Sequence, residues 1–249
     1  MTIDGLAFLG ESIFGGEVTA ERLLGRLGEA GVERAVVCPM KPPTYHLRSA
    51  NDAVAEAVRD HSGILTGLVR VDPLLRGEAA LEAERGLAEL GLRGVFLHPW
   101  EETFRIDDRV VDEVVEVARS RSVPVVVAAG YPWLSEGLQV GELAARFPEV
   151  TFVATNGLQI NMSGLGQTDA ELALAENPNL LIQTSGVYRE DFLERIVRRH
   201  GPERILFASA FPHFDPALEI RRVQWAAFSP SEQRSLLHDN AAHLYGISG

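Results

Sequence analysis

The sequence predicts an α/β fold of the (β/α)8 TIM-barrel class, in which eight parallel strands close into a barrel inside a ring of outer helices. Short apolar runs rich in Val, Ile, Leu and Phe alternate repeatedly with longer segments of helical periodicity. The runs are apolar throughout, which is typical of parallel strands buried on both faces. The length of 249 residues suits one such barrel, and no break in composition divides the chain, so residues 1–249 are expected to form a single domain.

The expected strands are the apolar runs, in chain order: Ile3–Leu9, Ala35–Met40, Leu65–Asp72, Gly94–His98, Val123–Ala129, Thr151–Asn156, Leu180–Ser185 and Ile205–Ala210. An open, doubly wound sheet is the alternative arrangement of such strands. That fold usually carries a glycine-rich first turn, and the stretch 5–10 lacks its spacing. The barrel is therefore the preferred fold.

A helix is expected after each strand: Thr19–Ala30, Ala50–Asp60, Glu78–Leu90, Asp107–Ser120, Gly141–Phe147, Asp169–Glu176, Glu190–Arg199 and Ser231–Leu244. The fourth begins with Asp107 and Asp108, and acidic side chains favour the first turn of a helix. Its apolar residues recur at three-to-four spacing. The last begins just after Pro230, a residue common at helix starts.

Composition restricts the classes of function. The chain is 46% hydrophobic and 23% charged, enough apolar residues for a large core. Its net charge of −12 argues against a nucleic-acid surface, which needs clustered positive charge. Cys38 is the one cysteine, so an intramolecular disulfide and a cysteine-based zinc site are excluded. No membrane span or secretory signal is visible, and a cytoplasmic protein without membrane contact is expected.

Several stretches, taken in their order and spacing, resemble the amidohydrolase-2 family of the amidohydrolase superfamily. They are residues 50–52 (AND), 67–73 (GLVRVDP), 94–99 (GVFLHP), 123–127 (VPVVV), 205–213 (ILFASAFPH) and 240–246 (NAAHLYG). The resemblance runs nearly end to end. It implies a (β/α)8 barrel of hydrolases, decarboxylases and hydratases, with chemistry at the carboxyl ends of the strands.

The resemblance also implies a divalent metal, usually zinc, that this chain is not expected to bind. The family's ligands are two histidines on the first strand, histidines closing the fifth and sometimes the sixth strand, and an aspartate closing the eighth. The corresponding positions here are Leu6, Phe8, Ala128, Asn156 and Ala210. None supplies an imidazole, thiolate or carboxylate, so neither a metal nor another cofactor is expected. Re-siting the metal is disfavoured, because no histidine pair has the helical spacing of a zinc motif.

Four residues near the expected barrel mouth are candidates for catalysis. His98 could act as a general acid or base, or simply satisfy a loop carbonyl. Lys41, the sole lysine, could form a Schiff base, hold an anion or be a solvated loop residue. Asn156 could orient a carbonyl or be a satisfied buried amide. His213 could be an imidazole oriented by Asp215, or part of a loop turn.

The remaining candidates are expected to form the substrate pocket: Phe8, Arg70, Ala128, Gln183, Ser209 and Trp100. Leu6 and Phe8 share strand parity with Asp4, so the pocket floor should be apolar. Arg70 could clamp a carboxylate, or instead pair with Asp72.

Three hypotheses of function follow. The first is a metal-independent enzyme that performs acid–base chemistry of the lyase, cyclase, isomerase, decarboxylase or hydrolase type on a small, carboxylate-bearing organic molecule. The second is a catalytically inactive partner of a related amidohydrolase, in a homo- or hetero-oligomer, and the third is a small-molecule binding protein. An open cavity between Phe8, Ala128 and Ala210 would favour a ligand site, whereas a barrel mouth filled by side chains would favour the inactive partner.

Overall fold

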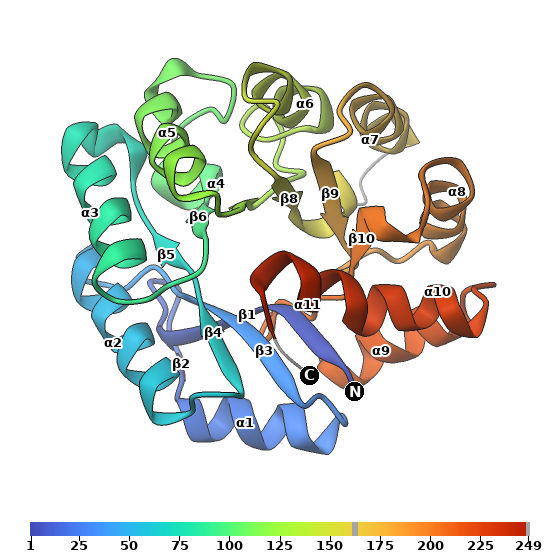
Figure 1. Cartoon of the computed structure of the whole chain (residues 1–249), viewed down its shortest axis with the longest axis horizontal. Coiled ribbons are helices and arrows are strands. Elements are labelled where there is room, and N and C mark those ends of the chain that lie inside the picture. Colours follow the sequence, from blue (N-terminus) through green and yellow to red (C-terminus); the bar gives the residue numbers. More distant parts are fainter. Residues whose placement is uncertain (161–163, 248–249) are drawn as a thin grey trace.

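The computed structural model describes residues 1–160 and 164–247, and within them eight parallel barrel strands lie inside a ring of helices (Figure 1). The first sheet segment has the order β2-β1-β3-β4 and the second the order β10-β9-β8-β7-β6-β5. The strands are β1 (Ile3–Glu11), β2 (Glu17–Val18), β3 (Arg34–Pro39), β4 (Leu65–Gly67), β5 (Val69–Arg70), β6 (Val95–Leu97), β7 (Val125–Val127), β8 (Phe152–Ala154), β9 (Leu180–Gln183) and β10 (Ile205–Leu206). The predicted fold class is confirmed.

Backbone hydrogen bonds join the two sheet segments into one barrel. Where β1 meets the chain that follows β10, the Gly5 amide donates to the Phe207 carbonyl and the Ala210 amide donates to the Leu6 carbonyl, both at 2.8 Å. At the other junction β4 and β5 are two halves of one barrel strand, interrupted at Leu68, whose amide donates to β3 at 2.8 Å. The ring is thus closed at both junctions.

The outer ring consists of the helices that connect successive strands. They are α1 (Ala20–Glu29), α2 (Leu47–Asp60), α3 (Gly77–Ala88), α4 (Pro99–Glu102), α5 (Asp112–Arg121), α6 (Gly137–Arg146), α7 (Gly164–Glu176), α8 (Glu190–His200), α9 (Pro216–Trp225), α10 (Pro230–Arg234) and α11 (Asn240–Tyr245). Single 3-10 turns occupy 73–75, 109–111, 155–158 and 202–204, and a π-helical turn spans 235–239. Among the described helices, none has the length and apolar composition needed to cross a membrane.

Helix α8 illustrates why these segments fold as they do. Phe192, Leu193, Ile196 and Val197 are buried at the spacing of one helical face, against the barrel. Acidic residues occupy the first turn and basic residues the last, which complements the helix dipole. The sequence pattern and the fold agree closely here.

The structure differs from the sequence expectation mainly near the mouth. The short hairpin strand β2, helix α4 and helix α9 were not expected, and the expected helix Ser231–Leu244 is divided by the π-helical turn. Helix α9 begins with Asp215 as N-cap and Pro216 at the first helical position, a start signal that was assigned to a loop. Of the expected strand Ile205–Ala210, only the first two residues pair with β9.

Candidate functional site

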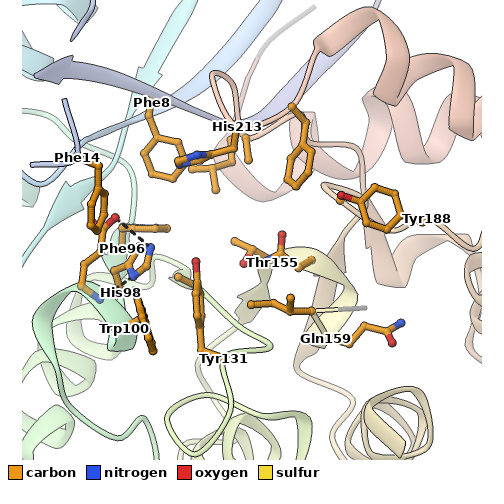
Figure 2. Close-up of a pocket in the computed structure, with 18 residues that line it drawn as sticks. Phe8, Phe14, Phe96, His98, Trp100, Tyr131, Thr155, Gln159, Tyr188 and His213 are labelled. Atoms are coloured by element: carbon orange, nitrogen blue, oxygen red, sulfur yellow. Dashed lines mark hydrogen bonds and ion pairs between the residues drawn. The ribbon is translucent and has the colours of Figure 1, made fainter. Parts of the chain in front are cut away.

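A cavity of about 320 Å³ lies at the carboxyl ends of the barrel strands (Figure 2). Its lining residues come from β1 and β6 and from the segments that follow β1, β6, β7, β8, β9 and β10. They are Leu6, Phe8, Phe14, Phe96, His98, Trp100, Glu101, Ala128, Tyr131, Thr155, Asn156, Gln159, Ile160, Gly186, Tyr188, Ala210, His213 and Phe214. The volume is at the lower end of the range of roughly 300–1,000 Å³ for small-molecule sites.

The five positions that correspond to the family's metal ligands all line this one cavity: Leu6, Phe8, Ala128, Asn156 and Ala210. Four of these side chains are hydrocarbon and have no lone pair to donate. In the parts of the chain that the structure describes, no three His, Cys, Asp or Glu side chains are grouped so that they could hold a metal ion. The donor set therefore does not fit a divalent metal.

Asn156 is held in a specific orientation at the cavity wall. It lies in the 3-10 turn after β8 with φ +54°, a left-handed conformation that asparagine tolerates better than most residues. Its Nδ2 donates to the Ala129 carbonyl oxygen at 3.1 Å, and its backbone amide donates to Ser185 Oγ at 3.4 Å. One amide hydrogen is thus used by the fold, while the side chain still lines the cavity.

His98 is buried and its tautomer is fixed by the backbone. It caps α4, and its Nδ1 accepts a hydrogen bond from the Glu101 amide at 3.2 Å. In the neutral ring the proton therefore resides on Nε2, which lies 3.8 Å from Glu101 Oε1. Burial, followed by the nearby Arg70 charge, lowers the pKa of His98 well below its ordinary value. At neutral pH this imidazole is an uncharged hydrogen-bond donor.

His213 lies on the opposite wall, against Phe8, with ring centroids 5.4 Å apart and planes at 73° (Figure 2). Partial desolvation lowers the pKa of His213, although the residue as a whole is exposed, and the Glu101 carboxylate opposes that shift in part. Asp215 does not orient this imidazole: it caps α9 through the Leu218 amide at 3.1 Å and pairs with Arg26. His213 thus faces the cavity as a second neutral ring.

Aromatic rings form a large part of the cavity wall. Phe8 and Phe96 pack edge to face at 5.6 Å, and the Phe96 ring in turn packs against His98 at 5.8 Å. Trp100 and Tyr131 are stacked, with centroids 5.7 Å apart and planes at 14°. Offset and edge-to-face pairs of this kind hold rings in fixed positions. The result is a wall of mutually packed aromatic rings around the cavity.

An ion cluster lies behind this wall and contains two of the predicted site residues, Arg70 and Lys41. Arg70 is 1% exposed, and its Nη2 donates to Glu102 Oε1 at 2.7 Å and to Glu101. Lys41 donates to the Glu101 carbonyl oxygen at 2.5 Å and lies 3.6 Å from Glu102 Oε1. Neither lines the cavity: Lys41 opens instead onto a neighbouring pocket of about 460 Å³. Asp72, the alternative partner of Arg70, accepts a hydrogen bond from the Leu74 amide at 3.0 Å.

Gln183 and Ser209 also lie outside the cavity, deeper in the barrel. Gln183 Nε2 donates to the Gly5 carbonyl oxygen at 3.0 Å. Ser209 Oγ donates to the buried carboxylate of Asp4, which also accepts from the Ser209 amide at 2.8 Å and from the Leu6 amide at 3.2 Å. These side chains connect β1, β9 and the chain after β10. The structure thus brings Phe8, His98, Trp100, Ala128, Asn156 and His213 together, and separates Lys41, Arg70, Gln183 and Ser209 from them.

The buried carboxyl group of Asp4 should make the free energy of unfolding depend on pH. Burial raises the pKa of Asp4 from 3.8 to about 6, although the hydrogen bonds from Ser209 and Leu6 lower it in part. The folded state then holds the proton more tightly than the unfolded state. As pH rises from about 4 to about 6, the free energy of unfolding of the wild type should fall relative to that of Asp4→Asn by on the order of 3 kcal/mol. Above about pH 6 the difference between the two proteins should no longer change with pH.

Urea unfolding of both proteins at a series of pH values measures this difference. The exposed carboxylate of Asp60 offers a control, because Asp60→Asn should leave the profile of the wild type unchanged. A difference between wild type and Asp4→Asn that is constant from pH 4 to 7 would contradict the prediction.

Sequence reasoning missed several lining residues, and some of them carried a usable signal. Phe96 has the same strand parity as His98, so it should have been expected on the same face. Glu101 follows His98 by three residues, the spacing of side chains on one helical face. Tyr131 lies four residues beyond the end of β7 at Val127. Phe14 and Tyr188 lie on loops, where no periodicity points to a cavity.

Comparisons with known proteins agree with this architecture. The sequence profile of a family described as amidohydrolase matches residues 20–247. An uncharacterised protein, y4mH, of Sinorhizobium fredii is 29% identical over 136 residues, which is 47% of this chain and 45% of that protein. The chain thus aligns with less than half of that relative.

Solved structures match over nearly the whole chain. A 5-carboxyvanillate decarboxylase from Sphingomonas paucimobilis is 16% identical with a TM-score of 0.76, covering 98% of this chain and 99% of that one. A 2,6-dihydroxybenzoate decarboxylase from Rhizobium is 15% identical with a TM-score of 0.78 and complete coverage of both (100%). A 4-oxalomesaconate hydratase from Rhodopseudomonas palustris is 16% identical with a TM-score of 0.72, covering 99% and 96%. At these identities the likeness establishes the fold alone.

Proposed function

Since the chain belongs to the amidohydrolase family, we propose that it is an enzyme on that family's barrel which works without a metal and performs acid–base chemistry on a small planar aromatic molecule. One observation carries the proposal. The positions that hold metal ligands in the family are lined here by hydrocarbon and one amide, and they enclose a cavity of about 320 Å³ that also contains two histidines. An apolar cavity with a few convergent polar groups is the usual form of a small-molecule site.

In this proposal His98 is the group that stabilises the charge that develops on the ligand. Its Nε2–H can donate a hydrogen bond to a carbonyl or hydroxyl oxygen of the ligand as negative charge develops there, because Nδ1 is already used by the Glu101 amide. His213 and Asn156 line the same cavity and position the ligand. Lys41 has no direct part and acts only through the ion cluster with Glu102.

The relatives support an aromatic or unsaturated substrate. Two of them are named as decarboxylases of a carboxyvanillate and a dihydroxybenzoate, both substituted benzene rings. The ring faces of Phe8, Trp100 and Tyr131 suit such a shape. A lyase reaction on an aromatic ring is accordingly preferred among the acid–base reactions expected from the sequence.

The open cavity bears on the two other hypotheses. An inactive partner protein would be expected to have Phe8 packed into the mouth, and here Phe8 lines an open space with Ala128 and Ala210. A binding protein without turnover remains the alternative, and only an activity measurement separates it from an enzyme.

A turnover screen on chelator-treated protein tests the proposal. The protein is dialysed against EDTA and incubated with hydroxylated benzenes, benzoic acids and their amides and esters, with changes followed by ultraviolet absorbance. At least one compound should be converted, and adding Mn²⁺ or Zn²⁺ should not increase the rate. Conversion that disappears on chelation and returns with metal would contradict the proposal, as would the absence of any conversion.

Filling the cavity should abolish ligand binding without unfolding the protein. Ala128 lines the cavity and its side chain makes no polar contact, so Ala128→Leu adds methyl groups directly into the ligand space. We expect at least a hundredfold loss of affinity for any compound found in the screen, measured by quenching of tryptophan fluorescence. Ala145→Leu, on the exposed face of α6, adds the same groups elsewhere and should bind normally. Equal affinities of the two variants would place the ligand outside this cavity.

A further inference from the structure

We infer that the cavity accepts its ligand only without a negative charge, so that an uncharged or cationic aromatic ring is bound and a carboxylate is excluded. The inference deepens the proposed function and rests on it. It also departs from the carboxylate-bearing substrate expected from the sequence, and the reason is the distribution of charge around the cavity.

The cavity surface offers an anion no positive charge. Of the described residues that line it, Glu101 is the only one of a type that is ionised at neutral pH. His98 and His213 are the remaining titratable groups that could become positive, and desolvation keeps the pKa of each below its ordinary value. A ligand at neutral pH therefore meets one carboxylate and two uncharged imidazoles.

The nearest cations are already paired and lie behind the wall. Arg70 donates to both Glu101 and Glu102 and is almost completely buried. Lys41 is held by Glu102 and by the Glu101 carbonyl oxygen, on the side of the neighbouring pocket. For Arg70 to reach a ligand carboxylate it would have to leave Glu101, which would then be a buried charge without a partner.

The aromatic rings of the lining supply no full positive charge that could pair with an anion. A ring face attracts cations and disfavours anions, and a ring edge carries only a partial positive charge. Phe8, Trp100 and Tyr131 contribute rings to the wall around the ligand space (Figure 2). The net charge of the chain, −12, adds a long-range field that disfavours anions.

An uncharged ligand avoids these costs. Moving a carboxylate from water into an apolar site is unfavourable unless it is paired and hydrogen-bonded. A hydroxyl or carbonyl oxygen needs only hydrogen-bond donors, and His98 Nε2–H is available for one. Neutral polar groups on a flat ring thus match the donors that the cavity provides.

Three ligands of nearly equal shape separate charge from size: benzamide, benzoate and benzamidinium. Their affinities for the chelator-treated protein are measured by isothermal titration calorimetry at pH 8 in 0.15 M salt. Benzoate should bind at least about tenfold more weakly than benzamide, and benzamidinium should bind no more weakly than benzamide. Benzoate binding as tightly as benzamide, or benzamidinium binding more weakly than benzoate, would overturn the inference and leave the proposed function standing.

Failure of all three ligands to bind would overturn the proposed aromatic site and the inference with it.

A variant tests whether the charge of Glu101 causes the preference for benzamide over benzoate. Glu101→Gln removes the carboxylate and releases one partner of Arg70, so the affinity ratio of benzamide to benzoate should fall towards one. Glu113→Gln removes the same charge from the exposed face of α5 and should leave the ratio unchanged. An unchanged ratio in Glu101→Gln would show that this charge does not exclude anions.

Discussion

Replacement of His98 by asparagine is expected to lower kcat by about 10²- to 10³-fold while the protein stays folded, which is the range for loss of one hydrogen-bond donor to developing negative charge. Asparagine places an oxygen where Nδ1 now accepts from the Glu101 amide, so the cap of α4 is kept. The Nε2–H has no counterpart in the shorter side chain. The variant therefore removes this hydrogen-bond donor and retains the local structure.

Steady-state kinetics on the compound found by screening, with thermal unfolding in parallel, measures both effects. His98→Ala should lose activity and also some stability, because both ring nitrogens are missing. His243→Asn removes an exposed imidazole from α11 and should behave as the wild type. A His98→Asn protein with wild-type kcat would show that His98 only caps the helix.

Replacement of Arg70 by methionine is expected to destabilise the protein by about 3–5 kcal/mol, the usual cost of removing one partner of a buried ion pair. Arg70 is 1% exposed and its Nη2 contacts two carboxylates, those of Glu101 and Glu102. Without it both carboxylates keep a neighbour of like charge and only Lys41 remains close. The corresponding fall in Tm is about 6–20 °C for a chain of this size.

Calorimetry or circular dichroism on heating measures the shift. Arg48→Met offers a matched control, because Arg48 is exposed and its pair with Glu82 lies at the surface. The double variant Arg70→Met/Glu102→Gln should regain part of the loss, since one unpaired carboxylate is gone. A Tm for Arg70→Met within 2 °C of the wild type would mean that the cluster contributes little.

The barrel could be predicted because its signals are local. The runs that became β3, β6 and β7 are short, apolar and bounded by turn residues, and the helices between them carry one apolar face. Of the elements that were missed, β2 is only two residues long, and α9 has a start signal, Asp215 followed by Pro216, that was assigned to a loop. Periodicity carries no information about such segments.

The positions of site residues at strand ends could be predicted from the sequence. The contacts of long charged side chains with several possible partners could not. His98, Ala128 and Asn156 lie at strand ends and do line the cavity. Lys41 and Arg70 also follow strands, but Glu101 and Glu102 on the unexpected helix α4 draw them into an ion cluster. Long charged side chains can reach several partners, so position along the chain does not determine which one they contact.

The central claim is that this barrel has replaced a metal centre with an organic ligand site, and direct titration with metal tests it. Chelator-treated protein is titrated with Zn²⁺ and Mn²⁺ by calorimetry, and bound metal is counted after gel filtration by mass spectrometry. We expect less than 0.1 equivalent of either ion per chain at micromolar concentrations, and no change in uptake when Ala128 is replaced by leucine. One equivalent of bound metal per chain that Ala128→Leu or His98→Asn abolishes would contradict the account.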